Sequence, residues 1–279
     1  MSESATFRGL NNILYKNSFL KAGIIIISFF IGVILVTFVY LPSNPYASVG
    51  PDFAPPSYSF PFGTTNIGQN ILSQWMVGTG STLSVGLIAA VVSMVFGVMF
   101  GISAAFVKHM DEPLMRSADV ILTLPTLPLM IVLAAFLKPT EDLIAIIIGI
   151  LSWPATARVI RSTSLSIKSQ PYIEVALMSG VPKRAIMFKD VFFHTLPIAL
   201  TYSIFSIIGA ILTIASLNFL GLGNLSYITW GSMIALANDS SAIYLGAWWW
   251  IIIPGLSIIL LSTGFAFIAY GLETKWRSI

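Results

Sequence analysis

The chain has 279 residues, of which 56% are hydrophobic and only 9% are charged, whereas soluble globular proteins carry roughly 25% charged residues. This composition excludes an ordinary soluble protein and predicts one that lies in a lipid bilayer. Cysteine is absent, which excludes disulfides and thiolate metal sites. The net charge is +3, and the placement of the charges along the chain is more informative than their sum.

Six windows of the sequence are apolar enough to cross a membrane, since a spanning helix needs about 20 mainly apolar residues. In chain order, we predict spans over residues 22–41, 81–107, 120–137, 143–157, 196–217 and 247–270. The fourth window is short, and we expect its helix to continue past Arg158 and Arg161. Core helices of a soluble protein are a poor explanation, because the windows show almost no amphipathic alternation. The first window is too long for the apolar region of a cleaved signal peptide, so the sequence predicts an all-α membrane protein with six transmembrane helices.

The basic residues indicate the orientation of these spans. If the amino terminus is cytoplasmic, residues 1–21, 108–118, 158–195 and 271–279 lie inside, and they hold 13 of the 14 lysines and arginines. Only Lys138 then lies outside. Because cytoplasmic loops carry an excess of Lys and Arg, we expect both termini in the cytoplasm. The basic excess is thereby explained as a topology signal, and no nucleic-acid partner is predicted.

The loop after the first span contains six prolines, which predicts an extended, ordered excursion without regular structure. We therefore divide the chain into residues 1–80, with an N-terminal cytoplasmic segment, the first transmembrane helix and this external loop, and residues 81–279, a five-helix core. Gly97 and Gly101 form a Gly-x-x-x-Gly pair that permits close helix approach, and we expect another helix of this chain as the partner. Four prolines lie inside predicted spans and allow kinks: Pro125, Pro128, Pro154 and Pro254.

The longest inside segment, between spans four and five, contains a pattern that the spans do not explain. Pro171 suits an early helical position, and Ile173, Leu177 and Ile186 follow a broadly apolar stripe. Gly180 is expected to break this stretch into two short helical pieces. Composition leaves two readings open, an interfacial membrane helix or a docking element for a soluble partner.

The same segment resembles the EAA loop of ATP-binding-cassette importer permeases, through Glu174, Ala176 and Gly180, followed downstream by Leu196 and Pro197. In that family the loop forms a coupling helix that sits in a groove of the ATPase subunit, and here it would cover about 171–186. The chain departs from the motif in two ways: Val175 replaces its usual first alanine, and Pro197 lies 17 residues after Gly180 where 13 are common. The resemblance implies that the following residues contact the ATPase: Tyr172, Glu174, Ala176, Gly180, Val181 and Lys183.

Further segments are similar to the dipeptide and oligopeptide permease group, in particular to the second permease of each pair. They begin at Ala54, Asp111, Ser152 and Ser216, as APPSYSFPFGTTNIGQNILS, DEPLMRSADVILTLPTLPL, SWPATARVIRSTSLSI and SLNFLGLG. In the first of these, Thr65 and Asn70 stand where aspartates are common. Together these segments cover most of the chain.

This resemblance implies a permease of the type I importer fold in a prokaryotic cell membrane, surrounded by lipid. The implied partners are a second homologous permease, two cytoplasmic ATP-binding subunits and an external solute-binding protein. The sequence has no Gly-x-x-x-x-Gly-Lys-Ser/Thr loop, so we expect ATP to be bound by the partners, with no cofactor and no enzymatic activity in this chain.

Other functions are less well supported by the sequence. His109 and His194 have no second ligand at helical spacing, so no metal site and no catalytic residue is predicted. An ion-gradient-driven secondary transporter or channel is the main alternative, but such proteins usually place ionisable residues at mid-membrane, and none is expected there. Among the substrates known for the group, we favour peptides over oligosaccharides or nickel complexes.

Overall fold

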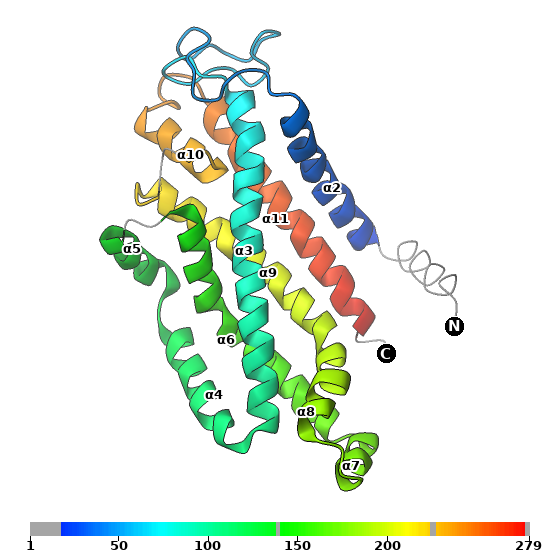
Figure 1. The fold of residues 1–279 in the computed structure, drawn as a ribbon. Coiled ribbons are helices and arrows are strands. Elements are labelled where there is room, and N and C mark those ends of the chain that lie inside the picture. Colours follow the sequence, from blue (N-terminus) through cyan, green and yellow to red (C-terminus); the bar gives the residue numbers. More distant parts are fainter. Residues whose placement is uncertain (1–17, 138–139, 224–226, 277–279) are drawn as a thin grey trace. The chain divides into compact units, whose positions relative to one another are not determined.

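The computed structural model describes residues 18–137, 140–223 and 227–276, and helices make up most of them (Figure 1). Residues 1–17 and Lys138, which entered the prediction of orientation, lie outside the described residues. The helices in chain order are α2 (Ser18–Val39), α3 (Ile71–Phe106), α4 (Lys108–Thr123), α5 (Thr126–Leu137), α6 (Glu141–Lys168), α7 (Pro171–Met178), α8 (Lys183–Ile186), the π-helix η1 (Met187–Val191), α9 (Phe192–Phe219), α10 (Trp230–Asp239) and α11 (Trp249–Trp276).

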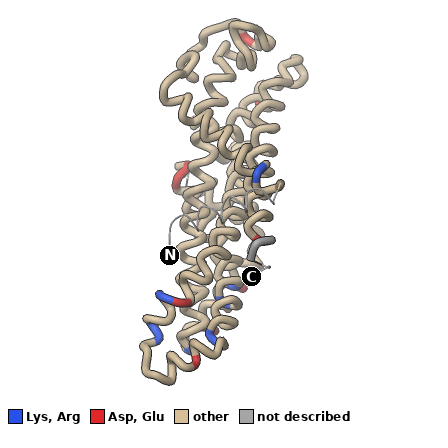
Figure 2. Tube along the Cα trace, turned by 90° about the vertical axis from the view of Figure 1, so that its right-hand side faces the viewer, with Lys and Arg blue, Asp and Glu red and all other residues tan. Residues whose placement is uncertain are grey.

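Within the described ranges, five helices are long and apolar enough to cross a membrane. They are α2, α3, α6, the continuous run of α8, η1 and α9, and α11. Long lengths of the chain carry neither basic nor acidic residues (Figure 2). Five of the six predicted spans are thus confirmed as continuous helices, and α3 begins about ten residues earlier than predicted. The remaining window, 120–137, has a different structure.

This third window is a bent pair of helices and not one continuous span. α4 and α5 meet at an angle of 84°, and Leu124 between them is extended, with φ −77° and ψ 129°. The residue before a proline disfavours the helical region, so Pro125 explains the break. α5 has 12 residues and therefore extends about 18 Å, less than the roughly 30 Å hydrocarbon core. The chain reaches six spans if the bent pair crosses as one.

The described residues form two compact units. Unit 1 contains α2, the start of α3 up to Val85, the end of α9 from Ile211, α10 and α11; unit 2 contains residues 86–137 and 142–210. In unit 1, α2 packs along α11 (Figure 1). The division of the chain into residues 1–80 and 81–279, which the sequence suggests, stays a prediction.

The proline-rich loop of unit 1, between α2 and α3, is ordered by hydrogen bonds between its backbone and a few polar side chains. Thr64 Oγ1 donates to the carbonyl of Pro51 at 2.6 Å and accepts from the Ala54 amide at 2.8 Å. Asn70 Oδ1 accepts from the amide of Leu72 at 2.9 Å, which caps the start of α3. The prediction of an ordered excursion without regular structure agrees with this arrangement.

In unit 2, α3 packs against α6 through the two glycines of the Gly-x-x-x-Gly pair. A Cβ atom at Gly97 would lie 2.6 Å from the Cβ of Thr156, and one at Gly101 would lie 2.8 Å from the carbonyl oxygen of Ala157. Such distances leave no room for a side chain, so the backbones approach as closely as glycine allows. The expected packing partner within the chain is therefore confirmed as α6.

Candidate functional site

The short helix α7 begins where the sequence predicts. Gln170, the residue before Pro171, is extended, with φ −75° and ψ 139°, and Pro171 occupies the first helical position, where its missing amide hydrogen costs nothing. The carbonyl of Gln170 accepts from the amides of Ile173 and Glu174 at 3.0 and 3.1 Å. Glu174 lies in the first turn, where a negative charge interacts favourably with the helix dipole.

The end of α7 is fixed by Gly180. Its φ is +83°, in the left-handed region where glycine has no steric cost. The Gly180 amide donates to the carbonyl of Leu177 at 3.2 Å, and the Val181 amide donates to that of Ala176 at 3.1 Å. This pair of bonds is a Schellman motif. It confirms the predicted break between two short helical pieces.

After the break, the chain continues through α8 and η1 into α9, which contains Pro197. The π-helix was not predicted. A π-helix closes its hydrogen bonds over five residues where an α-helix uses four, and η1 lies within the 17-residue interval between Gly180 and Pro197.

One face of α7 is anchored in the core of unit 2. Ile173 is only 1% exposed, and it belongs to a buried cluster with residues of α3, α6, α8, η1 and α9. Ala176 and Leu177 are partly buried and pack against the same cluster, at the spacing of three and four residues that defines one helix face. The other buried members are Val98, Ile102, Ala105, Phe106, Ile160, Ile186, Val191 and Ala199.

The opposite face of α7 is exposed although much of it is apolar. Met178 is 89% exposed and Val175 is 61% exposed, with Tyr172 at 51%. Glu174 lies exposed among them. The arrangement is a short, rigidly supported helix that presents apolar side chains and one carboxylate outward, which suits contact with another molecule.

The structure separates the six predicted contact residues into two groups. Five of them, all except Ala176, are exposed: Tyr172, Glu174, Gly180, Val181 and Lys183. Ala176 instead packs partly against the core cluster, so it supports α7 from behind. Val175 and Met178 are exposed beside those five residues, and their spacing from Ile173 along the helix already places them on the other face.

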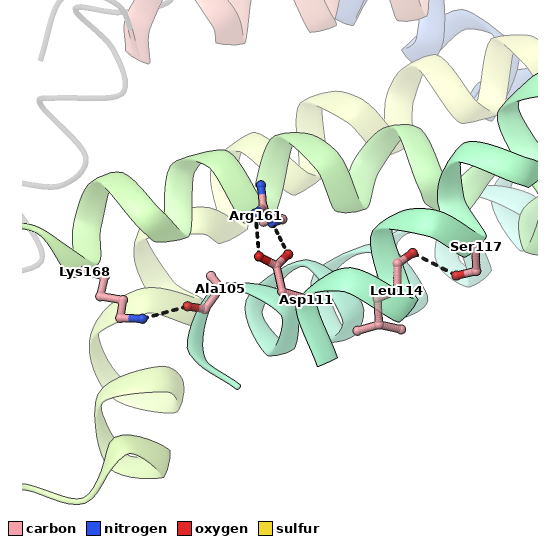
Figure 3. A network of polar contacts seen from close by, with 6 residues as sticks. All are labelled: Ala105, Asp111, Leu114, Ser117, Arg161 and Lys168. Carbon is pink, nitrogen blue, oxygen red and sulfur yellow. Dashed lines mark hydrogen bonds and ion pairs between the residues drawn. The ribbon is translucent and has the colours of Figure 1, made fainter. Parts of the chain in front are cut away.

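Ionic contacts surround the end of α6 that leads into α7 (Figure 3). Arg161 donates from Nε and Nη2 to the two carboxylate oxygens of Asp111, at 2.5 and 2.6 Å. Lys168 Nζ donates to the carbonyl of Ala105 at 2.9 Å and lies 5.2 Å from the centre of the Phe106 ring.

The sequence predicts no metal site at His109 or His194. His194 Nδ1 lies 2.5 Å from the carbonyl oxygen of Asp190, one turn earlier. Across residues 18–137, 140–223 and 227–276, no group of three or more His, Cys, Asp or Glu side chains could hold a metal ion.

The apolar helices define an integral membrane protein that crosses the bilayer several times. Comparison with known families matches residues 97–278 to the binding-protein-dependent transport system inner membrane component. The chain belongs to this family, which confirms the resemblance drawn from its motifs. It is a transport permease of the plasma membrane, and membership implies an ATP-binding-cassette system with an ATPase and a solute-binding protein.

Individual relatives extend the match to most of the chain. A putative peptide transport system permease protein of Brucella suis is 31% identical over 88% of this chain and 86% of the relative. The dipeptide transport system permease protein of Alkalihalophilus pseudofirmus is 31% identical over 93% of this chain and 86% of its own length. The oligopeptide transport system permease protein of Haemophilus influenzae is 30% identical over 93% and 84%. The family and these relatives do not favour the alternative prediction, an ion-gradient-driven secondary transporter or channel.

Proposed function

We propose that this chain is one of two permease subunits of an ATP-driven importer and contributes half of the translocation pathway. The other components would be a second homologous permease, two cytoplasmic ATP-binding subunits and an external solute-binding protein. Peptides are the proposed substrate, because the relatives at about 30% identity are named as peptide, dipeptide and oligopeptide permeases.

The contact with the ATPase is assigned to α7 and the residues that follow it, up to Ile186. The observation that carries this assignment is the exposure of Met178 and Val175 on a helix whose other face is buried. An interfacial membrane helix, the other reading of the sequence, would present cations toward anionic lipid. Within α7 the exposed face carries Glu174 and no cation, whereas Lys183 and Arg184 are exposed beyond the break; the carboxylate on α7 favours a protein partner with a cationic residue.

The position of α7 on the cytoplasmic side is supported by the distribution of basic residues along the sequence. Both termini are then cytoplasmic. ATP would be bound and hydrolysed by the partner subunits, and this chain would hold no cofactor. Closure of the ATPases would displace α7, and the buried contact of Ile173 with the α3 residues of the core cluster would pass that displacement to the membrane helices.

The substrate and the partners are tested together on the purified complex. The four membrane and ATPase subunits are isolated with the solute-binding protein, and the bound solute is identified by mass spectrometry. We expect peptides, and ATP hydrolysis that rises when the loaded binding protein is added; the complex without binding protein is the control. An oligosaccharide or a nickel complex as the bound solute would overturn the peptide assignment. ATP hydrolysis that does not change when the loaded binding protein is added would overturn the proposal of an importer.

A further inference from the structure

Helix α6 carries three cations on one of its faces. Arg158, Arg161 and Lys168 are separated by three and seven residues, and both spacings return to the same side of an α-helix. The last of them is the final residue of α6, and Pro171 begins α7 three positions later. The face therefore ends directly beside the proposed ATPase contact.

The three cations bind the two helices that meet at the α3–α4 corner, with two contacts along α4 and one at the end of α3. Arg158 pairs with Asp119 of α4, Arg161 pairs with Asp111 of α4, and Lys168 binds the carbonyl of Ala105 in α3. The corner is tight, because only Val107 separates α3 from α4. One helix face thus holds both arms of the corner.

The contact of Lys168 is directed at the end of α3. Ala105 lies in the last turn of that helix, where carbonyl groups lack a partner within the helix and attract cations. The neighbouring Phe106 ring lies under the same ammonium group and belongs to the buried cluster that contains Ile173 of α7. Lys168 and Ile173 therefore connect α3 to both sides of the α6–α7 junction.

Stability explains these contacts only in part. The Asp111 and Arg161 side chains are about one third exposed, and the Arg158–Asp119 pair is more exposed still. An exposed pair such as Arg158–Asp119 contributes little to folding, whereas the bidentate Arg161–Asp111 pair has the geometry in which a larger contribution is expected. Three contacts from one helix face, two spaced along α4 and one at the last turn of α3, also define where these two helices lie relative to α6 and α7.

We propose that Arg158, Arg161 and Lys168 form a coupling clamp that makes the α3–α4 corner move together with α6 and α7. The three residues are positioning residues, and the inference rests on the proposed ATPase contact at α7. In this arrangement, a displacement of α7 reaches α4, and through α4 the bend at Pro125, without separation of α4 from α6.

The clamp is tested by replacing its central ion pair with a reversible covalent link in the full complex. The chain has no cysteine, so Asp111→Cys together with Arg161→Cys introduces the only two thiols of this subunit. Before cross-linking, we expect the stimulation of ATP hydrolysis by loaded binding protein to fall about fivefold or more. A reducible bifunctional thiol reagent should restore it, and reduction should abolish it again. If cross-linking blocks stimulation instead, α4 and α6 must separate during transport and the clamp is refuted.

Two further sets of variants keep the inference testable if the cysteine pair assembles poorly. Asp111→Arg and Arg161→Asp should each impair stimulation, and their combination should recover it; Lys168→Arg should retain what Lys168→Met loses. The matched control is Arg116→Ala, which breaks the exposed Glu112–Arg116 pair of α4. This variant should leave the stimulation of ATP hydrolysis unchanged. Unimpaired stimulation in the single reversals, or no recovery in the combination, would reject the clamp.

The ATPase must still co-purify with every clamp variant. Loss of co-purification in these variants would mean that the three cations serve the ATPase contact directly, which overturns the clamp but leaves the contact at α7 intact. Failure of α7 variants to affect co-purification would overturn the contact itself, so the two proposals fail by different measurements.

Discussion

Ile173 and Met178 lie within one eight-residue helix and differ in exposure from 1% to 89%. Ile173 contributes to the core of unit 2, whereas Met178 contributes only to the surface. Truncation of the two side chains should therefore have separable effects.

Ile173→Ala should destabilise the subunit by about 2–5 kcal/mol, because it leaves a cavity in a packed cluster. Met178→Ala should leave thermal unfolding unchanged and weaken the association of the ATPase. Thermal unfolding of the purified subunit and quantitative co-purification measure the two effects. Met178→Leu, which keeps an apolar side chain of similar size, should retain the ATPase; equal losses from both alanine variants in both assays would contradict the two-faced arrangement.

Gly180→Val should disrupt the end of α7. A side chain in the left-handed region costs roughly 1–2 kcal/mol, and no neighbouring atom lies within 4 Å of a Cβ there, so the backbone conformation alone is responsible. We expect uptake to fall while ATP hydrolysis continues. Gly180→Asn is the matched control, because asparagine tolerates this conformation, and it should transport nearly normally. A valine variant with normal uptake would show that the Schellman motif is dispensable.

The sequence predicted the membrane helices well because each span carries its own local signal, a long uncharged apolar window. The bend between α4 and α5 was foreseen only as a kink at Pro125. Its angle depends on what packs against the two arms, which no local pattern contains. α10 was missed within a predicted loop: Thr229 and Ser232 form a capping box at its start, but serine stands where the sequence signature has Glu or Gln.

The site shows the same limit at the level of single residues. Pro171 and Gly180 correctly predicted a short helix with a break in this segment. The motif could not show that Ala176 faces inward, because much of the cluster against which it packs comes from distant parts of the chain, such as Val98 and Ile102 of α3. Likewise, the ionic contacts of α6 join residues about 40 to 60 positions apart, beyond any helical spacing rule.

Gly97→Val should destabilise unit 2, since even a Cβ atom would lie 2.6 Å from Thr156 and overpacking typically costs about 1–3 kcal/mol. The thermal midpoint in detergent measures this effect. Gly209→Ala in α9 is the control, because nothing lies within 4 Å of its Cβ position and alanine favours a helix over glycine. A tolerated valine at position 97 would imply that α3 and α6 are not in close contact.

Asn70→Ala should destabilise the start of α3 by about 0.5–2 kcal/mol, the usual cost of a lost helix cap. Asn70→Asp should preserve stability, since either carboxylate oxygen can accept from the Leu72 amide as Asn70 Oδ1 does at 2.9 Å. The aspartate variant adds a titratable group, so its stability should fall toward that of the alanine variant as the carboxylate becomes protonated in acid. Thermal unfolding of all three proteins at neutral and acidic pH measures this difference, and an aspartate variant that already unfolds like the alanine variant at neutral pH would refute the capping role.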